Sequence, residues 1–117
     1  MSPKKGDRVA PPAREGLWDL RFDSTQAAKG WETLCRQAPA NTLAAYNEMR
    51  ARQPKQAPTP RHHRLKGALA SAVRHGVELE QWQFEVTGSG RVWYLLDVEG
   101  RTLWLRYAGT GHPKATD

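Results

Sequence analysis

The chain has 117 residues, and its 18 Lys or Arg against 12 Asp or Glu give a formal net charge of +6 at pH 7. This length is typical of one domain that buries a core without disulfides. The single cysteine excludes a disulfide framework and a zinc site built from thiolates, and it favours a reducing, cytoplasmic compartment. No apolar run approaches the roughly 20 residues that cross a bilayer. The excess of cations favours an anionic partner, either nucleic acid or an acidic protein. No membrane partner is expected.

The chain begins with a polar stretch and then changes character. Residues 1–15, "MSPKKGDRVAPPARE", are rich in Pro, Gly and charge, which predicts a flexible basic tail before a single domain at 16–117. Within "LWDLRFD", at 17–23, apolar and polar side chains alternate. This period of two predicts a half-buried strand.

Two helices are predicted next. Asp23 and Ser24 can cap a helix that ends near Ala38, and Asn41 can cap a second helix that ends near Arg52. Prolines at 54, 58 and 60 forbid its continuation. The apolar stripes include the cysteine, which is therefore expected to pack in the core. The predicted stripe residues are Ala27, Trp31, Leu34, Cys35, Ala38, Leu43, Tyr46 and Met49.

Four strands are predicted after Gly67, because glycine-containing turns follow one another at 75–76, 87–90 and 98–100. Short turns join antiparallel neighbours. The order strand, two helices, four-stranded antiparallel meander predicts an α+β fold with the helices packed on one face of the sheet. The strand residues expected to meet the helices are Trp18, Leu20, Phe22, Trp82, Phe84, Val86, Val92, Tyr94, Leu96, Leu103, Leu105 and Tyr107.

The opposite face of this predicted sheet combines cations, indoles and amides. Its residues are Gln81, Gln83, Glu85, Arg91, Trp93, Leu95, Thr102, Trp104 and Arg106. Guanidinium groups bind phosphate, indole rings stack on bases and amides read base edges, so the pattern is typical of single-stranded RNA binding. The alternative is that Trp93 and Trp104 are buried under the basic loop or a partner protein.

The segment 59–67, "TPRHHRLKG", is strongly basic. It lies within 49–77, which holds seven Lys or Arg and no Asp or Glu. A metal site is disfavoured there, because adjacent side chains of an extended segment point in opposite directions and no Cys or spaced His completes a ligand set. A phosphate-handling site and a solvated loop both remain open.

The order of these elements, with "HRLKG", "GRVWYLLD" and "RTLWLRYAGTGHPK" in succession, resembles the RelE/ParE toxin superfamily over residues 17–114, nearest to its HigB-like and RelE-like toxins. The resemblance implies a RelE-like fold and a small endoribonuclease that needs no metal or cofactor. Such toxins cut mRNA, usually on the ribosome, and thereby inhibit translation. The implied partner is a cognate antitoxin, either a helix-turn-helix protein or an acidic one. A gyrase-inhibiting toxin of the same fold, or a basic nucleic-acid-binding module without chemistry, is the alternative.

The resemblance also assigns residues. Cleaving members have an arginine after the glycine turn, which matches Arg91, and a His, Lys, Arg or Tyr just after the last strand, where His112 and Lys114 stand. Members also place a base or cation beside the "LK" motif, which here brings in His62, His63, Arg64 and Lys66. Two departures are visible: glutamines and a glutamate replace the lysines of RelE-type members in "EQWQFEV", and a hairpin is inserted after "LKG".

Metal-free RNA cleavage needs a base for the 2′ proton, a cation for the phosphate and an acid for the leaving 5′ oxygen. Histidine suits both proton transfers because its pKa lies near neutrality. We expect His63 or His62 as the base, with Glu85 as a competing candidate. Arg91 is expected on the scissile phosphate and His112 as the acid. The expected substrate-binding residues are Arg61, Arg64, Lys66, Gln83, Trp93, Trp104, Arg106 and Lys114.

Overall fold

The alternation at the start of the domain is confirmed in the computed structural model, which describes residues 3–9, 16–53 and 55–111. In the first strand, β1 (Asp19–Phe22), Leu20 and Phe22 are buried, whereas Asp19 and Arg21 are half-buried. The elements that follow are α1 (Thr25–Gln37), α2 (Pro39–Arg50), β2 (His62–Arg64), a short 3-10 helix η1 (Gly67–Leu69), β3 (Ser71–Arg74), β4 (Val77–Glu85), β5 (Arg91–Asp97) and β6 (Thr102–Gly109).

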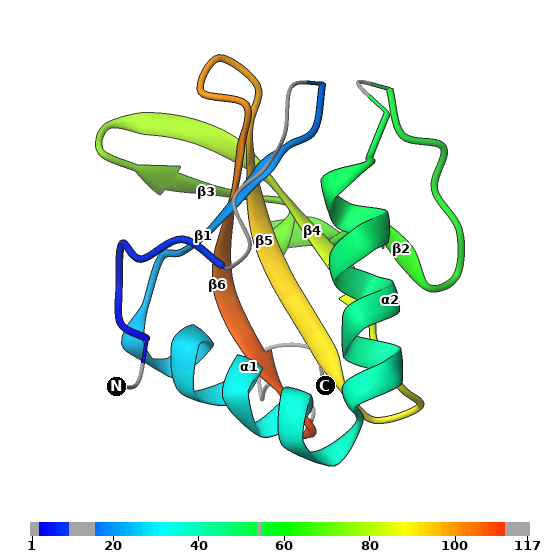
Figure 1. The fold of residues 1–117 in the computed structure, drawn as a ribbon. Coiled ribbons are helices and arrows are strands. Elements are labelled where there is room, and N and C mark those ends of the chain that lie inside the picture. Colours follow the sequence, from blue (N-terminus) through cyan, green and yellow to red (C-terminus); the bar gives the residue numbers. More distant parts are fainter. Residues whose placement is uncertain (1–2, 10–15, 54, 112–117) are drawn as a thin grey trace.

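The sheet has the strand order β1-β6-β5-β4-β2, and β3 pairs with β4 off this path (Figure 1). Consecutive strands from β3 to β6 are antiparallel, as predicted. However, β1 lies parallel to β6, from Asp19 beside Thr102 to Phe22 beside Leu105. The prediction of a four-stranded antiparallel meander is therefore wrong, because the sheet is six-stranded and mixed.

Two pairings account for this difference. β2 is three residues long and lies in a basic segment, so no hydrophobic alternation marks it as a strand. It pairs with the C-terminal part of β4, where His62 stands beside Phe84. The parallel pairing of β1 with β6 joins segments from opposite ends of the domain, and no turn signal in the sequence predicts it.

Both helices lie on one face of the sheet (Figure 1). Ser24 caps α1 by accepting a hydrogen bond from the Ala27 backbone N–H at 3.0 Å. α2 begins at Pro39 instead of being capped by Asn41, since proline suits the first turn, where an N–H lacks a partner in any case. The Asn41 amide donates to the Val86 carbonyl at 3.3 Å. No helix in the described ranges is long and apolar enough to cross a membrane.

Most of the predicted helix stripes are confirmed, but two of their residues are exposed. The buried stripe residues are Ala27, Trp31, Leu34, Tyr46 and Met49. Cys35 is exposed and does not pack in the core, and Leu43 keeps 59 % of its surface exposed. Small residues contact the sheet in their place. At Gly30 an added Cβ would lie 1.7 Å from the Ala108 carbonyl oxygen. α1 therefore approaches β6 more closely than a stripe of large side chains would permit.

A β-bulge changes one predicted core residue. Trp93 of β5 stands opposite Tyr107, whereas the next residue, Tyr94, stands opposite Leu105, so Arg106 is an extra residue in β6. One extra residue moves every following side chain to the other face of the sheet. Ala108 is therefore in the core, fully buried. The prediction that Tyr107 faces the helices is wrong, since its ring contacts Trp93 on the opposite face.

Part of the predicted N-terminal tail runs beside β1. The Val9 N–H donates to the Leu20 carbonyl at 2.7 Å, and the Phe22 N–H donates to the Asp7 carbonyl at 3.0 Å. Val9 is 3 % exposed and joins the core cluster. Residues 3–9 thus pair with the domain, and residues 10–15 of the predicted tail lie outside the described ranges.

Candidate functional site

The two adjacent histidines of β2 face opposite sides of the sheet. His62 stands beside Phe84, points into the core and is 5 % exposed. His63 stands beside Gln83 on the other face and is half-buried. Alternation along a strand imposes this separation. Of the two candidate bases, His63 is therefore the one on the face opposite the helices, which we call the open face.

His62 belongs to a buried polar cluster. Its Nε2 lies 2.7 Å from the Tyr94 hydroxyl, which also accepts a hydrogen bond from Arg52 Nε at 3.0 Å. The Arg52 guanidinium lies over the Trp82 ring, 4.5 Å from its centre. Burial, and secondly the positive charge of Arg52, lowers the pKa of His62 to about 4. His62 is thus neutral at pH 7, and it shares a hydrogen bond with the Tyr94 hydroxyl inside the core.

Four adjacent strands place His63, Gln83, Trp93 and Tyr107 in one row across the open face, which we call the open row. Each residue is the register partner of the next, from β2 through β4 and β5 to β6. Trp93 Nε1 donates to Gln83 Oε1 at 2.9 Å, and the Trp93 and Tyr107 rings lie 5.8 Å apart. Because Trp93 is 7 % exposed, it supports the row and does not offer a whole ring face to a base.

One hydrogen bond of His63 fixes which of its two ring nitrogens donates. Its Nδ1 lies 3.0 Å from the Arg64 carbonyl oxygen. A carbonyl can only accept, so Nδ1 carries the proton in this contact and Nε2 of the neutral ring keeps its lone pair. A general base requires such an unprotonated nitrogen.

Arg91 lies next to the open row and faces Glu85. The two are register partners on β5 and β4, with Arg91 Nη1 3.6 Å from Glu85 Oε2. Their side chains are 11 % and 29 % exposed. The predicted phosphate-binding residue and the alternative base therefore meet in an ion pair. A phosphate that binds Arg91 has to compete with the Glu85 carboxylate.

Trp104 and Arg106 are engaged away from the open row. Arg74 of β3 lies over Trp104, with its guanidinium carbon 3.4 Å from the ring centre, and donates to Asp23 at 2.8 Å. Arg106 Nε lies 3.4 Å from the same Asp23 carboxylate. Since a cation already occupies one face of the Trp104 ring, at most the other face could stack on a base.

The cations of the basic segment differ in their contacts. Arg61 donates to the Glu85 carbonyl at 3.0 Å, and Arg64 donates to the Ala70 carbonyl at 2.9 Å. Both side chains thus brace neighbouring backbone, although both residues are exposed. Lys66 is also exposed, in the loop between β2 and η1.

The predicted acid and one predicted phosphate ligand, His112 and Lys114, lie outside the described residues. The last described residue, Gly111, accepts a hydrogen bond from the Tyr107 hydroxyl at 2.8 Å through its carbonyl. Tyr107 therefore ties the end of the open row to the residue that precedes His112. Sequence reasoning missed Tyr107 as a site residue, because a single bulge residue leaves no signal in hydrophobic alternation.

The described residues contain no group of three His, Cys, Asp or Glu side chains that could hold a metal ion. Comparisons of the chain with protein-family models, curated proteins and solved structures find no match.

Proposed function

We propose that this protein is a toxin of the RelE/ParE type, a metal-independent endoribonuclease that cleaves mRNA in association with the ribosome and inhibits translation. The observation that carries the proposal is the open row. It brings a histidine with an available Nε2 and a tyrosine onto one face, with Arg91 beside them. A base, a cation and hydrogen-bonding groups on one accessible face are what RNA cleavage requires.

The spacing of the strands allows His63 and Arg91 to act on one phosphodiester. Neighbouring strands lie about 4.8 Å apart, so β2 and β5, which flank β4, lie about 10 Å apart. Gln83 and Glu85 of β4 occupy the space between the two side chains. An RNA backbone lying over β4 therefore has His63 on one side and Arg91 on the other.

The proposed reaction uses the 2′-hydroxyl of the RNA as nucleophile. His63 Nε2 takes the 2′ proton while the 2′ oxygen forms a bond to phosphorus and the bond from phosphorus to the 5′ oxygen breaks. Arg91 exchanges Glu85 for the phosphate oxygens and stabilises their developing charge. The leaving 5′ oxygen takes a proton from His112, the acid assigned by resemblance. The products are a 2′,3′-cyclic phosphate and a 5′-hydroxyl.

The proposed protein partner is an antitoxin that neutralises this face. A carboxylate-rich segment laid over the open row would replace Glu85 at Arg91 and cover Lys66, because opposite charges across an interface attract and orient the partners. RNA and antitoxin would then compete for the same cations.

The test is cleavage of labelled mRNA by the purified protein, with and without ribosomes. We expect the His63→Ala variant to cleave on the order of 10²-fold more slowly, the usual size of a general-base contribution, with RNA affinity nearly unchanged. The matched control is His62→Gln, one residue away on the other face. We expect it to cleave at the wild-type rate per folded molecule.

Other outcomes would change the assignment. Equal rates for His63→Ala and the wild type would remove His63 as the base. Inhibition of DNA gyrase without any RNA cleavage would instead indicate the gyrase-inhibiting type of toxin. Binding of RNA without cleavage would indicate a nucleic-acid-binding module.

A further inference from the structure

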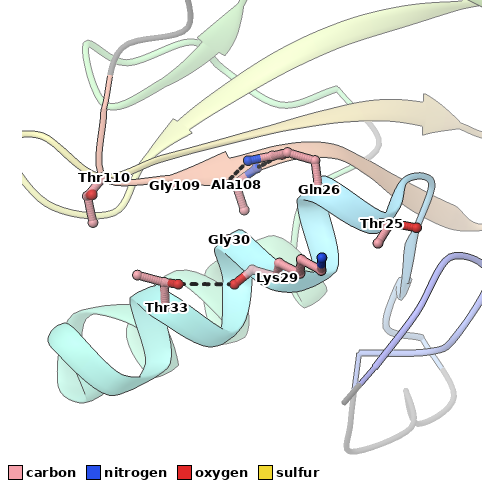
Figure 2. A pocket seen from close by; sticks show the side chains of 8 residues that line it. All are labelled: Thr25, Gln26, Lys29, Gly30, Thr33, Ala108, Gly109 and Thr110. Atoms are coloured by element: carbon pink, nitrogen blue, oxygen red, sulfur yellow. Dashed lines mark hydrogen bonds between the residues drawn. The ribbon is translucent and has the colours of Figure 1, made fainter.

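A pocket of about 570 Å³ opens between α1 and the end of β6 (Figure 2). The helix residues from Thr25 to Thr33 and the strand residues 108–110 line it. The Gln26 amide fixes the two walls, since it donates to the Ala108 carbonyl at 2.9 Å and accepts from the Ala108 N–H at 3.3 Å. Gly30 brings the helix backbone against the same strand residue. The pocket is thus formed by a fixed contact between a helix and a strand.

The side chains around this pocket favour an anionic ligand. Lys29 contributes an ammonium group, and Thr25 and Thr110 contribute hydroxyls, whereas the Thr33 hydroxyl donates to the Lys29 carbonyl at 3.2 Å (Figure 2). None of the described residues that line the pocket is Asp or Glu. The acid nearest in the helix sequence, Glu32, lies 4.0 Å from Arg36 one turn further on. An ammonium with two hydroxyls and no carboxylate among the described lining residues suits a phosphate group.

The pocket adjoins the open face at β6. Gly109, which lines the pocket, is the register partner of Arg91. Neighbouring strands lie about 4.8 Å apart, so the pocket begins one strand beyond Arg91. The backbone groups of Ala108 are already used by Gln26, so this part of the β6 edge does not pair with an added strand. The arrangement therefore fits a ligand that crosses the sheet better than a peptide that extends it.

We propose that this pocket binds a backbone phosphate of the RNA, adjacent to the phosphate held by Arg91, with Lys29 as its main ligand. This inference rests on the proposed function. In this proposal the RNA follows the open row from β2 to β6. It then leaves the sheet over Gly109 and enters the pocket at Thr110. The pocket then fixes the direction in which the RNA lies on the open face, because His63 and Lys29 are at opposite ends of the RNA path.

The test is the salt dependence of binding to labelled single-stranded RNA, measured by fluorescence anisotropy with the full chain. Each phosphate contact on a single strand contributes about 0.7 to the slope of log K against log salt concentration. We expect Lys29→Gln to reduce the magnitude of this slope by about 0.7. Lys29 is exposed on the helix, and glutamine is a good helix former, so the fold is retained. Thr110→Val, which removes one hydroxyl and keeps the shape, should weaken binding less.

The matched control is Lys5→Gln, which removes one charge from an exposed lysine outside the pocket and the open row. We expect it to leave the slope at the wild-type value. If the wild type binds RNA and Lys29→Gln has the wild-type slope, the pocket is not a phosphate site and the proposed function stands. If the wild type binds no RNA, the proposed function fails and this inference with it. Titration with inorganic phosphate tests a further case. If the pocket binds free phosphate through Lys29, but Lys29→Gln does not change RNA binding, RNA is not the ligand of the pocket.

Discussion

A histidine and a tyrosine stand on each face of the sheet, and the two pairs have different environments. Towards the helices, His62 and Tyr94 are buried and share a hydrogen bond of 2.7 Å. On the open face, His63 and Tyr107 are half-buried, and each contacts a backbone carbonyl. The neighbouring positions of the two histidines on one strand decide which of them reaches solvent. Residue type alone therefore does not identify a functional histidine, whereas its face on the strand does.

The largest effect that separates the two faces is expected in acid. The pKa of His62 is lowered to about 4 in the folded protein, from 6.5, whereas the unfolded chain takes up the proton near the ordinary value. The free energy of unfolding is therefore highest above about pH 6.5. It falls by about 3 kcal/mol as the pH is lowered towards about 4, because the unfolded chain binds a proton that folded His62 does not. Urea denaturation across this range measures it. We expect His62→Gln to lose less stability on acidification than the wild type, and His63→Gln to lose as much. Equal losses in the wild type and His62→Gln would contradict the buried, neutral state of His62.

A smaller contrast is expected between the two tyrosines. Tyr94→Phe removes the hydroxyl that joins Arg52 to His62, leaving buried polar atoms without this partner, and should lower the free energy of unfolding by about 2 kcal/mol. Tyr107→Phe removes an exposed hydrogen bond to Gly111 and should cost less than about 1 kcal/mol. Denaturant midpoints of both variants check this. Similar losses for the two variants would mean that the faces are equally accessible to water.

The smallest effect concerns the hairpin formed by β3 and β4, whose Arg74 lies over Trp104. Arg74 forms an ion pair of 2.8 Å with Asp23, and the two side chains are 18 % and 11 % exposed. Arg74→Gln should cost about 1 kcal/mol and change the fluorescence of Trp104, because a partly buried pair and a cation–π contact are lost. The control is Arg36→Gln, whose pair with Glu32 is long and exposed, at 4.0 Å. It should change stability by less than about 0.5 kcal/mol. A fluorescence spectrum unchanged in Arg74→Gln would show that the hairpin does not depend on this contact.

Local signals in the sequence predicted the local structure. The turn after β3 is an example, since His75 and Gly76 both adopt positive φ, at 48° and 80°, in the predicted two-residue connection. Alternation likewise predicted the burial of Trp82 and Phe84. These features depend on neighbouring residues, so a single sequence is enough to reveal them.

The remaining features depend on contacts between distant residues. The bulge at Arg106 moves Tyr107 to the open face, and the sequence on either side of it keeps an unbroken alternation. β2 carries no apolar pattern, so the sequence left His62 and His63 as equal candidates. The strand pairing with β4 separates them. The sequence therefore predicted the types of residue in the open row. It did not predict which histidine and which aromatic residues share that face.

The parallel pairing of β1 with β6 has a consequence for the order of events during synthesis. Ser24, just after β1, donates to the Arg106 carbonyl across 82 positions of the chain. β1 therefore stays without its strand partner until almost the whole domain has left the ribosome, and contacts of such long range slow folding. A nascent chain cannot assemble the open row before β6 has been made. For a protein proposed to act on translation, this topology delays any activity until β6 has left the ribosome.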